Sequence, residues 1–91
     1  MEDNVERVML YQKMLDVVQE VIQERHRQNT TWGVAHDDQH DNITWGMLFE
    51  DRVHQMVSYP PPNSVSRDRR LLIEIAALAV AAVESIDRKA G

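Results

Sequence analysis

The sequence predicts an all-α fold, and three observations carry this prediction. Apolar residues recur at steps of three and four in three long segments, which is the helix periodicity, and no segment alternates as a strand does. Polar and proline-rich stretches separate the three segments. The 91 residues form a single domain, 1–91, and a domain of this size buries only about 60–65% of its unfolded surface. We therefore expect a bundle of three main helices that is completed by oligomerisation.

The first helix is expected from Asn4 to about Gln28, with Asp3 or Asn4 as its cap. No glycine or proline interrupts this segment. At about 1.5 Å per residue the helix is roughly 36 Å long, so it needs a long surface to pack against. Its apolar stripe contains Val5, Val8, Met9, Leu15, Val18, Val21 and Ile22, widened by Tyr11, Met14 and Val17.

The stretch Asn29–Asn42 is predicted to be a loop, because it contains a glycine and several Asx residues that form turns readily. The second helix begins with Asn42 or Thr44 as its cap and runs to about Ser58. The segment Tyr59–Asn63, with three prolines, then ends it. The apolar face of this helix contains Trp45, Leu48, Phe49, Val53, Met56 and Val57.

The third helix is expected to begin with Ser64 or Ser66 as its cap and to run to about Lys89. Among the thirteen residues from Leu71 to Val83, only Glu74 is not apolar. A carboxylate in so apolar a helix needs a cation, a donor or a metal, or a cavity onto which it opens, because burying an unpaired charge is costly.

Composition and charge exclude several classes of protein. The chain has no cysteine, hence no disulfide or thiolate metal site, and its net charge of −5 disfavours binding to nucleic acid. No apolar run approaches the roughly 20 residues that span a bilayer, and no signal peptide is recognisable at the N-terminus. We expect a soluble cytoplasmic domain that does not contact a membrane.

A first candidate site lies in the second helix. Glu50, Asp51 and His54 are spaced so that they can converge on one ion, and Glu74 from the third helix can complete the set. Oxygen ligands of this kind suit Mg²⁺. The alternative is that these residues form the solvated side of an amphipathic helix.

The sequence resembles small phage-type MazG-like proteins, a family of all-α nucleotide pyrophosphohydrolases. The resemblance extends from Val21 to Arg88 and rests on Glu24-Arg25-His26-Arg27-Gln28, Trp32-Gly33, Leu48-Phe49-Glu50-Asp51 and Ile73-Glu74-Ile75-Ala76-Ala77. It implies that acidic residues bind Mg²⁺, which positions a nucleoside triphosphate for cleavage between its α and β phosphates. It also implies, for a phage-encoded chain, a location in the host cytoplasm.

The chain departs from the family motif, Glu-Glu-x-x-Glu followed by Glu-x-x-Asp. Glu50 and Asp51 match the first two acids, but His54 stands at the third. Glu74 aligns either with the final Asp or with the Glu before it, and either register leaves three of the five acids. A histidine ligand shifts metal preference toward Mn²⁺ and softer ions. If the site is active, Glu50, Asp51 and Glu74 are its catalytic residues; otherwise the chain binds a nucleotide without hydrolysing it, or acts as a helical interaction module.

Three further groups are candidates for ligand contacts. Arginines near the end of the first helix and the start of the third can bind phosphate, or else form exposed ion pairs. Trp32 or Trp45 offers a flat surface for a base, or else belongs to the core. The loop from His36 to Asp41 can hold a metal, cap the second helix, or fold over a nucleotide pocket behind Trp32. The arginines in question are Arg25, Arg27, Arg67, Arg69 and Arg70.

Overall fold

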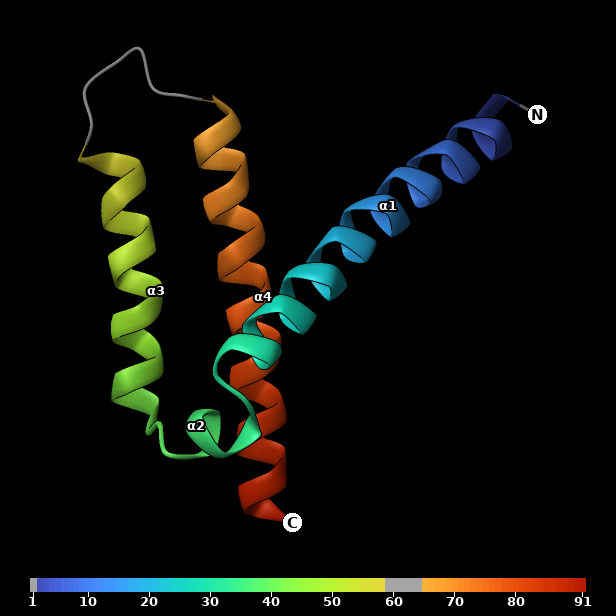
Figure 1. Cartoon of the computed structure of the whole chain (residues 1–91). Coiled ribbons are helices and arrows are strands. Elements are labelled where there is room, and N and C mark those ends of the chain that lie inside the picture. Colours follow the sequence, from blue (N-terminus) through green and yellow to red (C-terminus); the bar gives the residue numbers. More distant parts are fainter. Residues whose placement is uncertain (1, 59–64) are drawn as a thin grey trace.

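The computed structural model describes residues 2–58 and 65–91, which form four helices and no strand (Figure 1). The all-α prediction is confirmed. Helix α4 (Val65–Ala90) lies at the centre and contacts α1 (Glu2–Thr31), α2 (Val34–Asp38) and α3 (Asn42–Val57). In Figure 1, α3 and α4 stand side by side, whereas α1 meets α4 with its C-terminal half and projects away with its N-terminal half. Within the described residues, no helix combines the length and apolar character needed to span a bilayer.

Helix α1 is longer at both ends than the sequence predicts. It begins at Glu2, so Asp3 and Asn4 lie in its first turn and the prediction that one of them is the cap is wrong. At the other end the hydroxyls of Thr30 and Thr31 donate to the carbonyls four residues before them, at 2.9 and 3.0 Å. These bonds satisfy the hydroxyls inside the helix, which therefore continues through both threonines.

The predicted loop Asn29–Asn42 contains a short helix, so that prediction is wrong in part. Gly33 has a φ of 84°, a left-handed conformation that glycine adopts without strain, and it redirects the chain from α1 into α2. The cap of α3 is Asp41 rather than Asn42 or Thr44. Its carboxylate accepts the backbone N–H of Thr44 at 2.7 Å, which satisfies one of the free donors at the helix start.

The remaining helix ends agree with the predictions where the structure describes them. Helix α3 ends at Val57 and α4 ends at Ala90, each within one residue of the expected end. Ser66 lies inside α4 and is therefore not its cap. The other predicted cap, Ser64, and the proline segment Tyr59–Asn63 lie outside the described residues.

The core is small and lies between α3 and α4. Trp45 packs with Leu78, Ala81 and Ala82, and the partly buried side chains of Leu48 and Phe49 pack against this cluster. The α4 side chains that face away from this cluster remain exposed, notably Leu72, Val80, Val83 and Ile86. In the single chain α4 is thus buried along one side only.

Candidate functional site

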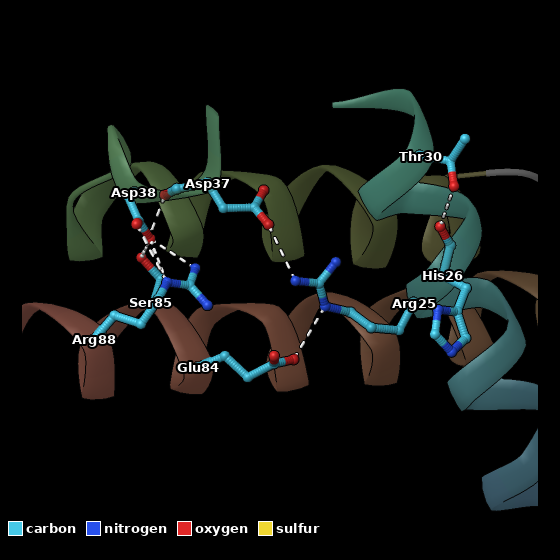
Figure 2. Close-up of polar contacts among 8 residues, drawn as sticks. All are labelled: Arg25, His26, Thr30, Asp37, Asp38, Glu84, Ser85 and Arg88. Atoms are coloured by element: carbon cyan, nitrogen blue, oxygen red, sulfur yellow. Dashed lines mark hydrogen bonds and ion pairs between the residues drawn. The ribbon is translucent and has the colours of Figure 1, made fainter. Parts of the chain in front are cut away.

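A polar clamp fastens α2 to the two long helices around it. The guanidinium of Arg25, on α1, lies between Asp37 on α2 and Glu84 on α4 (Figure 2). Its Nη2 donates to Asp37 Oδ2 at 3.3 Å and its Nε donates to Glu84 Oε1 at 3.1 Å. The side chains of Arg25 and Asp37 are only 13% and 10% exposed, so this ion pair is shielded from solvent. One arginine therefore joins three helices.

A second part of the clamp involves Asp38, Ser85 and Arg88 (Figure 2). Arg88 Nη2 donates to Asp38 Oδ1 at 2.6 Å, and the hydroxyl of the buried Ser85 donates to the same oxygen at 2.9 Å. The bond from Arg88, helped by the bond from Ser85, holds the pKa of Asp38 below its usual range. Lys89 Nζ donates to the carbonyl of His40 at 2.6 Å. Together these contacts fix the chain from Asp37 to His40 against the end of α4.

An aromatic cavity adjoins the segment from Asp37 to His40 that the clamp holds against α4. Four rings follow one another: Trp32 stacks on His36, His36 meets His40 edge to face, and His40 meets Trp45 edge to face, with centroids 6.4, 4.9 and 4.8 Å apart. These four rings, with Asp37, Leu48, Arg52 and Leu78, line a cavity of about 190 Å³. The cavity draws on α2, α3, α4 and the turn after α1, so no single element of the sequence defines it.

Trp45, in the wall of the aromatic cavity, carries a buried donor for which the described residues offer no hydrogen-bond partner. This donor is its Nε1, in a residue only 3% exposed. Buried N–H groups nearly always have a partner, and leaving one unsatisfied costs about 1–3 kcal/mol. The cavity is therefore suited to a ligand or water that offers hydrogen-bond acceptors between aromatic rings.

Glu74, the carboxylate in the apolar helix, is neutralised by cations. Its side chain is 19% exposed and lies 3.4 Å from Nε of Arg52 and 3.5 Å from Nε of Arg70. Of the alternatives that the sequence left open, the structure shows the cationic partner. Arg52 thus stands between Glu74 and the aromatic cavity.

The other predicted metal ligands lie on a different side of α3. Glu50, Asp51 and His54 line one shallow hollow together with Met47. Glu50 and His54 are each two residues from Arg52, which is about 200° around the helix, so they face away from Glu74. Within residues 2–58 and 65–91 no three His, Asp or Glu side chains are placed to hold a metal. In the single chain the four predicted ligands do not fit one ion.

All five arginines predicted to contact phosphate have a carboxylate partner. Arg25 and Arg70 pair as described above, Arg27 with Glu24, Arg67 with Asp68, and Arg69 with Glu20. The bond from Arg27 lowers the pKa of Glu24, and the bond from Arg69 lowers that of Glu20. These pairs match the ion-pair alternative, and any phosphate that binds here must compete with a carboxylate.

Arg52 is a site residue that the sequence reasoning missed. It follows Trp45 and Leu48 at steps of three and four, so it occupies the apolar face of α3 rather than the polar face. The sequence could have revealed Arg52, because a charged residue on the apolar face of a helix needs a partner. No pattern in the sequence pointed to Asp37 or Ser85 as members of the clamp, because only the folded chain brings α2 next to α4.

The chain was compared with protein-family models, with curated proteins and with solved structures. None of the three comparisons found a match. The aromatic cavity and the residues around it are consequently the features of this chain that point to a function.

Proposed function

We propose that this chain binds a nucleotide by holding its base in the aromatic cavity. The observation that carries the proposal is the buried Trp45 N–H, which lacks a partner in the wall of a ring-lined cavity. A nucleobase has a flat π-face that can stack on the rings of this cavity, and ring nitrogens that can accept the Trp45 N–H. The resemblance to MazG-like proteins, drawn from the sequence, supports the same ligand class.

The size of the aromatic cavity determines how much of the ligand it holds. Its volume of about 190 Å³ exceeds the roughly 30 Å³ of a water molecule and falls short of the roughly 300–1,000 Å³ of drug-sized pockets. One ring system therefore fits inside, while the sugar and phosphates lie outside. Binding consequently depends on the base more than on the length of the phosphate chain.

Binding without hydrolysis is the form of this function that the geometry favours. Cleavage through Mg²⁺ or Mn²⁺ requires Glu50, Asp51 and Glu74 to act together, and Glu74 is instead paired with Arg52 and Arg70. The second candidate is nevertheless a nucleoside triphosphate pyrophosphohydrolase, because one hollow gathers Glu50, Asp51 and His54. These two candidates differ in whether pyrophosphate is released.

Calorimetry with the common nucleotides tests the base-binding proposal. The variant Trp45→Phe keeps a ring in place but removes the buried donor, so we expect about tenfold weaker binding, the equivalent of one hydrogen bond. Trp32→Phe is the matched control, because Trp32 lines the same cavity but is 44% exposed, so its N–H can bond to water. Equal affinities for wild type and Trp45→Phe would contradict the proposal, as would the absence of binding to every nucleotide.

A second assay separates binding from cleavage. The protein is incubated with natural triphosphates and Mg²⁺ or Mn²⁺, and pyrophosphate is measured. Binding without pyrophosphate supports sequestration, whereas release that disappears in Glu50→Gln but persists in Glu6→Gln supports the enzyme. Both glutamates are exposed, so neither variant is expected to disturb folding.

We further propose that the chain forms a homo-oligomer. Its radius of gyration is 16.1 Å, while a compact domain of this length has about 12 Å, because half of α1 projects from the body. The projecting half exposes large apolar side chains all along its length, including Val8, Leu10, Tyr11, Met14 and Leu15. A helix with little tertiary contact is marginal in water, so a second chain is needed to cover it.

A further inference from the structure

The outer face of α4 carries an apolar seam that the chain itself leaves uncovered. Its members follow one another at steps of four, three, four and three, which is the repeat of helices that pair side by side. The four large side chains on this face are between 44% and 57% exposed. The seam consists of Leu72, Ala76, Ala79, Val83 and Ile86, with Val80 beside it.

The shape of this seam suits a second helix. Two alanines occupy its middle and larger residues lie toward its ends, so another backbone can approach closely at the centre. Ala79, Val80 and Val83 line a shallow hollow there, together with Glu84. Other faces of α4 already contact α1, α2 and α3. The seam is therefore a separate surface that is free to pair.

Charges at the two ends of α4 identify the partner as a second copy. Asp68 and Arg69 lie near its start, and Asp87 and Lys89 near its end. In an antiparallel pair Asp68 faces Lys89 of the other copy and Arg69 faces Asp87. Both pairings have their midpoint at residues 78 to 79, and the seam from Leu72 to Ile86 has its midpoint at residue 79 as well. A parallel pair would instead set Asp68 against Asp68 and Arg69 against Arg69.

The two basic residues, Arg69 and Lys89, keep enough bonding capacity for these contacts. Arg69 bonds Glu20 through its two terminal nitrogens, which leaves Nε–H available. Lys89 uses one of its three donors on the carbonyl of His40. Antiparallel helices also align their dipoles favourably. We propose that two copies of this chain pair through α4, antiparallel, about a two-fold axis that passes near Ala79.

Cysteine cross-linking tests both the surface and its direction, because the chain contains no native cysteine. A disulfide requires Cα atoms within about 7 Å. Oxidised Ala79→Cys should form a disulfide-linked dimer, and Leu72→Cys alone should not, since the antiparallel arrangement separates its two copies. An equal mixture of Leu72→Cys and Ile86→Cys should cross-link into the mixed dimer, because these two positions lie opposite each other about an axis at residue 79. Cross-linking of Leu72→Cys with itself, or no cross-linking of Ala79→Cys, would overturn the proposal.

Solution mass provides a second readout. Val83→Arg places a charge in the seam and should halve the mass of the assembly measured by light scattering. Val57→Arg is the matched control, because Val57 is exposed at the end of α3 and lies off the seam, and it should leave the mass unchanged. Circular dichroism confirms that both variants remain helical. A wild-type monomer, or an unchanged mass for a helical Val83→Arg, would contradict the proposal.

Discussion

Arg25 is the residue on which the polar clamp depends most, because it neutralises one carboxylate on α2 and another on α4. Removing one partner of a buried ion pair destabilises the fold more than replacing both partners with apolar residues does, since the other charge stays buried without compensation. The side chain of Asp37, 10% exposed, is in that position. The pair of Arg70 and Glu74 lacks this penalty, because Glu74 keeps its second cationic partner, Arg52, when Arg70 is removed.

We expect Arg25→Met to lower the free energy of unfolding by about 3 kcal/mol, because it leaves Asp37 unpaired. Arg70→Met makes the same change at an arginine side chain that is 79% exposed and leaves Glu74 paired with Arg52, so it should cost less than about 1 kcal/mol. Urea unfolding of the three proteins measures both values. Similar losses in the two variants would show that the clamp is no stronger than a surface pair.

Asp38 makes the stability of the chain depend on pH. Its folded pKa lies below its ordinary value of 3.8, chiefly because Arg88 donates to it. The unfolded chain therefore binds this proton more readily than the folded chain does. The stabilisation is present above about pH 4 and disappears as the pH falls through the folded pKa.

The variant Asp38→Asn should accordingly be less stable than wild type at neutral pH, and the difference should shrink as the pH falls from about 5 to about 2. Chemical unfolding at several pH values measures this difference. Asp16→Asn serves as the control, because that exposed carboxylate accepts a hydrogen bond from Gln12 and, among residues 2–58 and 65–91, none from an arginine. A difference that stays constant, or grows in acid, would contradict the assignment.

At the scale of the element, α2 shows how a five-residue helix stays in place. It is too short to be stable by itself, so its position depends on contacts with α4. The fully buried Ser85 is the neutral member of these contacts: its hydroxyl donates to Asp38, and the carbonyl of Asp37 is 3.4 Å away. Because His36 and Asp37 of α2 line the aromatic cavity, anything that loosens α2 also opens that cavity.

Ser85→Ala should therefore act mainly on α2. We expect a loss of about 1 kcal/mol of global stability, the usual value of a hydrogen bond, and faster amide exchange in residues 34–38 than in wild type. Hydrogen exchange with mass analysis measures the second effect. Ser66→Ala changes an exposed serine of the same helix and should alter neither quantity. Unchanged exchange in residues 34–38 would mean that the ion pairs alone hold α2.

The helices were predictable from the sequence to different degrees, for physical reasons. The C-terminal ends of α3 and α4 follow from local chemistry, since a change of periodicity or composition marks them in the chain itself. α2 has no such mark, because distant residues such as Ser85 and Arg88 hold it in place. The threonines that lengthen α1 normally disfavour helices, and only their hydroxyl bonds to the preceding turn let the helix continue.

At the scale of the whole molecule, the candidate site was likewise predictable from the sequence only in part. The sequence indicated that Glu74 needs a cation, a donor, a metal or a cavity, and the structure provides two cations, Arg52 and Arg70. It did not indicate that Glu50 and His54 face away from Glu74, because that depends on how α3 is rotated about its own axis. A residue spacing places side chains on a common face, but only packing decides toward which neighbour that face turns.

The projecting half of α1 provides the last test, since it distinguishes a self-associating chain from one that awaits a different protein. Alone, residues 5–19 have few tertiary contacts and should open often, whereas a second copy should protect them. Amide exchange in residues 5–19 of the purified chain should therefore slow as protein concentration rises, because association is driven by mass action. Residues 71–82 of α4, which include most of the buried core, serve as the internal control. Fast exchange in α1 at every concentration would instead favour a foreign partner for this helix.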